Sequence, residues 1–156
     1  MAGISGAGIR GAIAGIGLFV LMMTPGFAQE RLSGDQITKI LGEQGYSVQQ
    51  IAAETVAVVV GEQVILVTVD GLDGDVSYIT YVPGLSQREL GLEFLNEFNN
   101  AVKFGRAYVD GDGGIAIQMD RNAVGGISAE NILSDFDVFL LLVTKFLSDV
   151  STGSIA

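Results

Sequence analysis

The sequence predicts a single α+β domain in two layers, in which an antiparallel β-sheet packs against about three helices. Stretches rich in β-branched residues follow one another with turns too short to hold a crossover helix, so the strands must run antiparallel. Amphipathic stretches with capping residues lie before, between and after these strands. A sheet with one apolar face needs helices to cover that face, which gives the two layers.

The elements follow from local signals along the chain. Ser33 and Gln36 have the spacing of a capping box, in which each side chain satisfies a backbone N–H at a helix start, and Ser86 and Glu89 repeat it. Gly61-Glu62 separates two β-branched runs, which predicts a hairpin. The expected order is a helix at 34–44, strands at 46–53, 55–60, 63–69 and 76–82 (the last ending at Pro83-Gly84), a helix at 86–102 with an apolar face that includes Leu92, a hairpin of strands at 106–109 and 115–119, and a helix at 129–149.

The composition limits the chemistry that this domain can carry. The chain has 156 residues with no cysteine, histidine or tryptophan, and 18 acidic against 8 basic residues give a net charge of −10. The missing cysteine and histidine exclude disulfides, thiolate nucleophiles, Cys/His zinc sites and histidine-based triads. An acidic chain repels phosphate backbones, so no nucleic acid partner is expected. The length suits one hydrophobic core.

The first 28 residues are typical of a secretory signal. Residues 11–23 form an uncharged run, and Pro25 follows it just before small residues that end at Ala28. A helix of that run spans about 20 Å, which is short of the roughly 30 Å hydrocarbon core of a bilayer. We therefore expect cleavage between Ala28 and Gln29, export to the periplasm and only a transient contact with the membrane. The alternative is that residues 11–23 remain as an inner-membrane anchor of a tethered structural subunit.

The last helix carries an unusual apolar stretch. Residues 138–143 are apolar without a break, so the helix lacks a polar stripe over almost two turns. A helix of this kind is expected to be buried on both sides, by the sheet and by a partner subunit, which predicts a homodimer through the C-terminal helix. Residues 151–156 are expected to be a disordered tail.

Several short motifs, taken in order, resemble the YbjN domain family. They are Asn96-Glu-Phe-Asn99, Phe104-Gly-Arg-Ala-Tyr108-Val-Asp110, residues 115–120 and Gly125-Gly-Ile-Ser128-Ala-Glu-Asn131, together with Gly45-Tyr46 at the end of the first helix. The resemblance covers about residues 33–148, within a domain expected at 29–150. It implies a fold similar to the chaperones of type III secretion, often dimeric, in a bacterial regulator of sensory transduction for which no catalytic residues are established.

The chain departs from the family pattern in two places. Phe98 stands where the family often has tryptophan, which is a mild change within the core. Residues 70–75 lack the cysteine pair that exported relatives often carry near this turn. The second departure argues against a redox role and leaves the expected fold unchanged.

The glycine-rich and acidic motifs do not form a cofactor or metal site. Residues 6–11 match GxGxxG, but no strand precedes them as a dinucleotide site requires. The Asp-Gly turns at 70–75 and 110–114 resemble pieces of a calcium loop, yet they lack the glycine and glutamate that an EF-hand needs at fixed positions. Asp-Gly pairs form tight hairpin turns on their own account. We expect no metal and no cofactor.

Catalysis is not indicated by the acidic residues either. Glu89, Glu93 and Glu97 recur every four residues, which is the pattern of a solvated helix face, and no nucleophile or oxyanion motif accompanies them. We therefore expect no catalytic residue. The alternative is a carboxylate-dependent enzyme, which would need a deep pocket holding two acids with a raised pKa.

One polar patch is the candidate recognition site. It comprises Asn96, Asn99, Lys103, Arg106 and Tyr108, near the end of the second helix and the start of the second hairpin. The alternative is structural, with the asparagine side chains satisfying backbone groups of the loop and Arg106 neutralising nearby acids. Together these features predict an exported, non-enzymatic module of the bacterial envelope that binds a peptide or protein or acts as a regulator.

Overall fold

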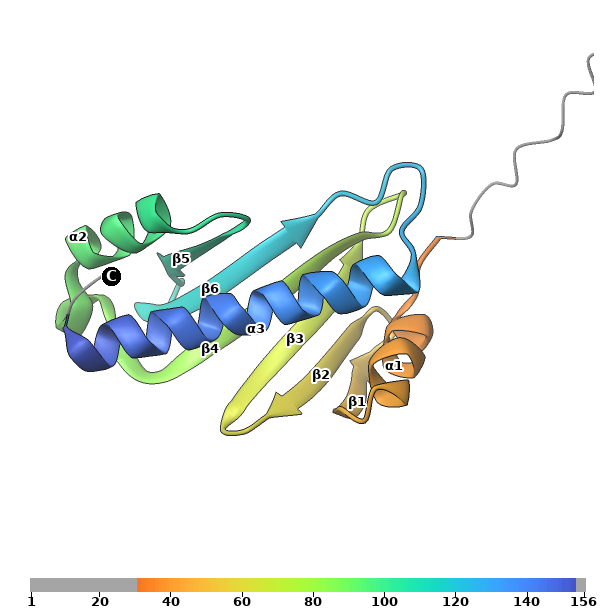
Figure 1. Ribbon diagram of the computed structural model, residues 1–156, viewed down its shortest axis with the longest axis horizontal. Helices are drawn as coiled ribbons and strands as arrows, with labels where there is room; N and C mark the ends of the chain where they lie inside the picture. Colours follow the sequence, from red (N-terminus) through yellow and green to blue (C-terminus); the bar gives the residue numbers. More distant parts are fainter. Residues whose placement is uncertain (1–30, 154–156) are drawn as a thin grey trace, which may run out of the picture.

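The computed structural model describes residues 31–153, which form one six-stranded antiparallel sheet and three helices (Figure 1). In chain order the elements are α1 (Gly34–Glu43), β1 (Ser47–Ala52), β2 (Thr55–Val60), β3 (Gln63–Asp70), β4 (Asp75–Ser86), α2 (Gln87–Ala101), β5 (Gly105–Val109), β6 (Gly114–Arg121) and α3 (Ala129–Thr152). The predicted α+β class is confirmed. The expected signal segment, with cleavage between Ala28 and Gln29, lies outside the described residues.

The strands lie in the order β1-β2-β3-β4-β6-β5, and each neighbouring pair is antiparallel. The first four strands are the predicted meander, and β5 and β6 are the predicted hairpin. The hairpin joins the meander through β6, where Met119 lies opposite Tyr78 of β4. β5 is therefore one edge of the sheet, and β1 is the other.

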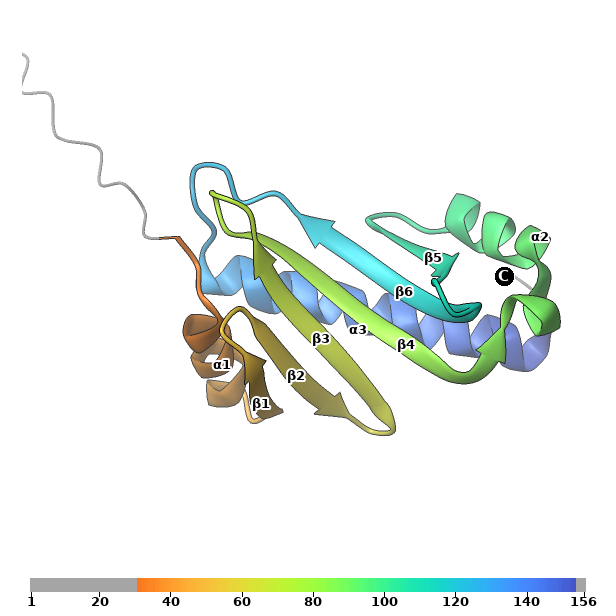
Figure 2. The same ribbon diagram turned by 180° about the vertical axis from the view of Figure 1, so that it is seen from behind.

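The three helices cover one face of the sheet, and the opposite face has no helix over it (Figures 1 and 2). α3 runs across the covered face and buries side chains three or four residues apart, which are Ile132, Phe136, Phe139, Val143 and Phe146. Aromatic rings join the layers, since the ring centroid of Tyr78 in β4 lies 6.0 Å from that of Phe139 in α3. The result is the predicted two-layer core.

α1 begins as its capping box predicts. The Ser33 hydroxyl accepts from the Gln36 backbone N–H at 3.4 Å, and the Gln36 side chain accepts from the Ser33 N–H at 2.9 Å. Gly34 follows, and a Cβ placed there would lie 2.5 Å from the Ala53 carbonyl oxygen. The glycine lets the helix approach the turn between β1 and β2 closely.

The predicted end of the fourth strand at Pro83-Gly84 is wrong, because β4 continues to Ser86. Its pairing with β6 is irregular between Val82 and Ser86, so the proline, which has no N–H to donate, sits where the ladder is already interrupted. The predicted capping box at Ser86 and Glu89 is also wrong. The Ser86 hydroxyl donates to the Glu89 carboxylate at 2.8 Å and caps no backbone group.

α2 is kinked, although the sequence predicts one continuous helix. Gly91 has φ 77° and ψ 157°, which is far from helical geometry and divides α2 into two short helical pieces. Leu95 and Phe98 of the second piece are buried as expected. Leu92, predicted on the same apolar face, lies directly after the kink and is exposed instead.

α3 runs to Thr152 and ends at Gly153, which has the left-handed conformation typical of a helix end. The helix therefore includes two residues that the sequence places in the tail. Leu141, in the apolar stretch, is 69% exposed in the single chain, so only the sheet side of α3 is buried. The homodimer through this helix stays a prediction. None of the helices within residues 31–153 combines the length and apolar character needed to cross a membrane.

Candidate functional site

The five residues of the predicted recognition patch do not share one surface. Arg106 and Tyr108 lie on β5 and point to the open face of the sheet, as the alternation of exposed and buried positions on this strand shows. Lys103 lies on the helix side, where it lines a hollow beside α3. Asn96 and Asn99 lie on α2. The structure therefore splits the patch between two faces.

Asn99 has the structural role that the alternative interpretation gives it. Its side-chain amide donates to the Ala107 carbonyl at 3.0 Å, and its side-chain carbonyl accepts from the Ala107 N–H at 2.8 Å. The amide thus occupies the hydrogen-bonding place of a further strand beside β5. Asn96, one turn earlier, is exposed.

Arg106 belongs to a small polar network on the open sheet face. Its guanidinium donates to Asp120 at 2.9 Å, and Ser77 and Gln118 donate to the same carboxylate, each at 2.7 Å. Burial alone would raise the pKa of Asp120, but these hydrogen bonds and the charge of Arg106 outweigh it and lower that pKa. Arg106 also lies 5.9 Å above the ring centroid of Tyr108. Asp120 therefore carries a negative charge that its neighbours compensate.

The helix side carries a groove that the sequence does not predict. Two hollows, of about 430 and 270 Å³, lie between α3 and the loop from α2 to β5, and both are lined by Phe104 and Val138. We call this pair of hollows the Phe104 groove. Met119, Leu141 and Leu142 add apolar surface to it.

Phe104 is exposed and conformationally strained. It has φ 70°, and it is the one residue other than glycine with a positive φ between 31 and 153. Its side chain is 76% exposed, so little burial offsets this conformation. Gly105 follows it, and a Cβ there would lie 2.5 Å from Leu142 of α3. The glycine allows β5 to approach α3, and Phe104 stands directly beside that contact.

Charged groups lie at one end of the Phe104 groove. Arg121 Nε lies 3.0 Å from Asp135 Oδ2, and that oxygen is buried yet accepts no hydrogen bond within the described residues. Burial raises the pKa of Asp135, and Arg121 counters this only in part. Burial likewise raises the pKa of Tyr78, helped by Asp135, and the Tyr78 hydroxyl donates to the Ile132 carbonyl at 3.4 Å. The groove therefore ends at a half-buried ion pair of Arg121 and Asp135.

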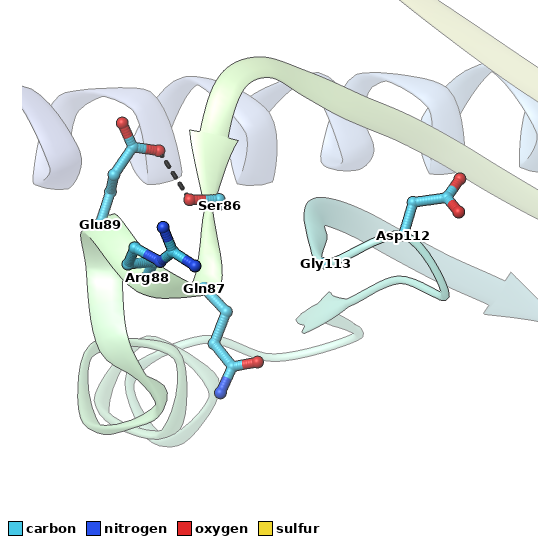
Figure 3. Close-up of a pocket in the computed structure, with 6 residues that line it drawn as sticks. All are labelled: Ser86, Gln87, Arg88, Glu89, Asp112 and Gly113. Carbon is cyan, nitrogen blue, oxygen red and sulfur yellow. Dashed lines mark hydrogen bonds between the residues drawn. The ribbon is translucent and has the colours of Figure 1, made fainter.

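Another hollow, of about 640 Å³, is a shallow notch where β4 meets α2 (Figure 3). It is lined by Ser86, Gln87, Arg88, Glu89, Asp112 and Gly113, and Figure 3 shows the Ser86 hydroxyl bonded to Glu89. The backbone N–H of Gln87 donates to the Gly113 carbonyl at 3.1 Å and ties the two sides together. A serine beside a carboxylate lacks the stronger base that activates a serine nucleophile.

The acidic turns are arranged as the sequence predicts. Asp110 accepts from the backbone N–H groups of Asp112 and Gly114, at 2.9 and 2.8 Å, which closes the turn between β5 and β6. Asp75 accepts from the Ala123 N–H at 2.8 Å. Across residues 31–153, no group of three or more acidic side chains is placed to hold a metal ion.

Sequence reasoning missed the Phe104 groove for a physical reason. The groove joins α3 to a loop about 35 residues earlier in the chain, and no local pattern reports that approach. Lys103 stands out in the sequence because basic residues are scarce. The local signal at the next residue, Phe104, is only that an aromatic side chain directly precedes a glycine.

Comparison with known proteins supports the same family as the motifs. A family described as "Putative bacterial sensory transduction regulator", YbjN, matches residues 33–151. The solved structure described as "Crystal structure of YbjN, a putative transcription regulator from E. coli" is similar in fold, with a TM-score of 0.59 and 12% identity. The alignment covers 78% of this chain and 94% of that one. No curated protein matches the chain. Since the family match spans most of the sequence and the fold agrees with it, the chain belongs to the YbjN family of bacterial regulator-like proteins.

Proposed function

We propose that this chain is an exported, non-enzymatic regulator that binds a segment of another protein in the Phe104 groove. The observation that carries the proposal is the pair of exposed apolar side chains, Phe104 and Leu141, on either side of the groove. Aromatic residues at the centre of an interface contribute a large share of binding energy. The family's description as a regulator fits a protein that acts by binding.

The strain at Phe104 supports this use of the groove. A residue with a Cβ in the left-handed conformation costs about 1 kcal/mol. Phe104 gains little burial in return. Conformations of this kind cluster at binding sites, where a ligand contact repays the cost. A partner that covers Phe104 would supply the missing burial.

The chemistry of the groove favours a protein segment as the ligand. Its walls are apolar at Val138 and Leu142, and the ion pair of Arg121 and Asp135 lies at its polar end. An apolar side chain followed by a polar group on the same segment would fit both. The groove contains a serine and an aspartate, Ser134 and Asp135. The sequence has no histidine to activate that serine and no cysteine nucleophile, which supports a non-enzymatic role.

Site-specific cross-linking in cells tests the proposal. A photo-cross-linking residue replaces Leu141 in the groove, and the same residue replaces Leu92, which is exposed on α2 away from it, as the matched control. We expect an adduct with another protein at position 141 and none at position 92. The adduct at 141 should disappear in the Phe104→Gly background. Equal adducts at both positions, or an adduct that persists in Phe104→Gly, would contradict the proposal.

The mass of the adduct also tests the predicted homodimer through α3. An adduct at position 141 of twice the chain mass would show that the groove holds a second copy and no other protein. That result would support the dimer predicted from the apolar stretch at 138–143 and would replace the partner segment proposed above.

Export is tested by the amino terminus of the protein in the cell envelope. Removal of the signal predicts a mature chain that starts at Gln29, found in the periplasm. A chain that starts at Met1 and stays with the inner membrane would show that residues 11–23 are a retained anchor.

A further inference from the structure

We propose that the open face of the sheet binds an amphipathic helix of another protein, a helix with apolar side chains along one side and lysine or arginine at one end. By the open face we mean the side of the sheet that no helix covers, with Ala57, Leu66, Ile79 and Gln118 across its middle (Figure 2). This face lies opposite α3 and the Phe104 groove, so the inference does not depend on the function proposed above.

One end of the open face is apolar. Val59 of β2 and Val64 of β3 lie directly opposite each other, and the register that pairs Ile65 with Thr80 places Val64 beside Tyr81 of β4. Val59, Val64 and Tyr81 are each about half exposed, so the rest of residues 31–153 leaves them open to a partner. Neighbouring exposed apolar side chains of this kind mark an interaction site.

The opposite end of the same face is acidic. Asp70 of β3 and Asp75 of β4 lie directly opposite each other in the register, and both are exposed. Together with Asp120 of β6 they line a hollow of about 380 Å³. Like charges directly opposite each other on neighbouring strands repel and destabilise a sheet. A positive charge placed in this hollow would remove the repulsion.

Neither Asp70 nor Asp75 forms an ion pair within residues 31–153. One oxygen of each accepts a backbone N–H, that of Gly71 for Asp70, at 2.7 Å, and that of Ala123 for Asp75, at 2.8 Å. These bonds orient the carboxylates but bring no positive charge to them. No group of three acidic side chains in this part of the chain is placed to hold a metal ion, which favours a lysine or arginine side chain as the cation.

The basic residues beside this face already have acidic partners. Arg106 is paired with Asp120 at 2.9 Å. Arg31 donates to the carbonyl of the β3–β4 turn, but its ion pair is with Glu54, at 2.9 Å. A second copy of the chain would bring its own acidic row and a further net charge of −10. Charge complementarity therefore favours a different protein with a basic segment.

The spacing of the two ends describes the shape of that segment. Val64 and Asp70 are six residues apart on β3, and Tyr81 and Asp75 are six apart on β4, which corresponds to about 20 Å along the sheet. An α-helix spans this distance with about 13 residues. A helix with one apolar side would cover the open face as α3 covers the other.

Binding of a synthetic peptide to the purified protein tests the inference, by isothermal titration calorimetry. The probe is a peptide of about 14 residues with leucines along one helical side, glutamines elsewhere and a pair of lysines at one end. We expect one-to-one binding with a Kd below about 100 μM. Glutamates in place of the lysines should weaken binding at least about 10-fold. A probe that does not bind, or that binds equally well with either charge, would overturn the inference.

Two pairs of substitutions separate the acidic row from the net charge of the chain. Asp70→Asn with Asp75→Asn removes two negative charges from the open face, and Glu93→Gln with Glu97→Gln removes two from exposed positions of α2. We expect the first pair to weaken binding of the lysine probe about 5- to 10-fold. The second pair should weaken it less than about 2-fold. Equal losses would show attraction by net charge alone and would overturn the inference.

The first pair has a second readout in the free protein. Because it removes the repulsion between opposed carboxylates, Asp70→Asn with Asp75→Asn should raise the urea midpoint of unfolding. The variant that binds the probe less tightly should therefore be the more stable one. A midpoint that does not rise would show that these carboxylates are already compensated, and would count against a basic partner.

Apolar substitutions locate the probe on the molecule. Val64→Thr keeps a β-branched side chain but makes the apolar end polar, and it should weaken binding about 5-fold. Leu141→Gln, in the Phe104 groove, should leave binding unchanged. The reverse result would place the probe in that groove, which would overturn this inference and leave the proposed function intact. A free protein that is a dimer by light scattering and a monomer in Val64→Thr would assign the face to a second copy and would also overturn it.

Discussion

Asn99 holds the outer edge of β5 through both groups of its side-chain amide. Asn99→Ala removes two hydrogen bonds to Ala107 and should lower the free energy of unfolding by about 2 kcal/mol. Urea denaturation measures the loss. Asn96→Ala, on the same helix and exposed, is the matched control and should change stability by less than about 0.5 kcal/mol. Equal effects of the two substitutions would show that the amide contributes nothing at this edge.

Two carboxylates, Asp135 at the Phe104 groove and Asp120 on the open face of the sheet, should respond to pH in opposite directions. Burial raises the pKa of Asp135, so the folded protein binds this proton more tightly than the unfolded chain does. The resulting contribution to stability is fully present below the unfolded pKa of about 3.9 and is lost as pH rises through the folded pKa. Asp135→Asn removes this loss. Relative to the unchanged protein, the variant should therefore gain unfolding free energy between pH 4 and pH 7.

For Asp120, the dependence of stability on pH should have the opposite sign. Its pKa is lowered, so its contribution to stability is present above the unfolded pKa and is lost as pH falls through the folded value. Asp120→Asn should be less stable than the unchanged protein at pH 7, and the difference should shrink toward pH 3. Urea unfolding at several pH values measures both variants. The same trend for both would mean that burial and hydrogen bonding do not set these pKa values as described.

At the scale of the element, Gly91 and Gly42 separate two roles of glycine within helices. Gly91 has φ 77° and ψ 157°, so Gly91→Ala should cost about 2 kcal/mol of unfolding free energy. Gly42 lies in α1 with no atom within 4 Å of an added Cβ, and Gly42→Ala should stabilise by about 0.5 kcal/mol. Thermal and urea unfolding report both. A stabilising Gly91→Ala would show that α2 is a continuous helix in solution.

The elements that the sequence predicts well are those that depend on neighbouring residues. The capping box at Ser33 and the hairpin around Gly61 are local, and both form as expected. The kink at Gly91 was missed because a glycine within an amphipathic stretch is compatible with a continuous helix. The extension of β4 past Pro83 was missed because proline is usually a strand end, and only the pairing with β6 shows where it is tolerated.

At the scale of the whole molecule, the excess of acids should limit stability. Glu93 and Glu97 lie one turn apart on α2 with like charges. Glu93→Lys replaces this repulsion with an ion pair and should raise the free energy of unfolding by about 0.5 kcal/mol in dilute buffer. Thermal unfolding in dilute buffer and in 1 M sodium chloride measures it. A gain that persists in high salt would point to a cause other than charge.

The candidate site could be predicted only in part, since it depends on how distant segments meet. Asn99, Arg106 and Tyr108 were identified from their residue types, and the structure gives each a contact. Their division between two faces depends on the alternation of side chains along β5, which places Arg106 outward and Ala107 inward. The Phe104 groove depends on the packing of α3, which no single segment encodes.

The contact between Asn99 and Ala107 also bears on how this protein resists polymerisation. Because the Asn99 side chain already occupies the outward N–H and carbonyl of Ala107, in the middle of β5, a strand from another molecule should add more readily alongside β1. Two molecules that pair through β1 would leave only their β5 edges outward, each occupied at Ala107, and this disfavours growth into a fibre. The Asn99 amide thus protects one edge of the sheet from strand addition, in a chain that has no cysteine and so no disulfide to hold its edges.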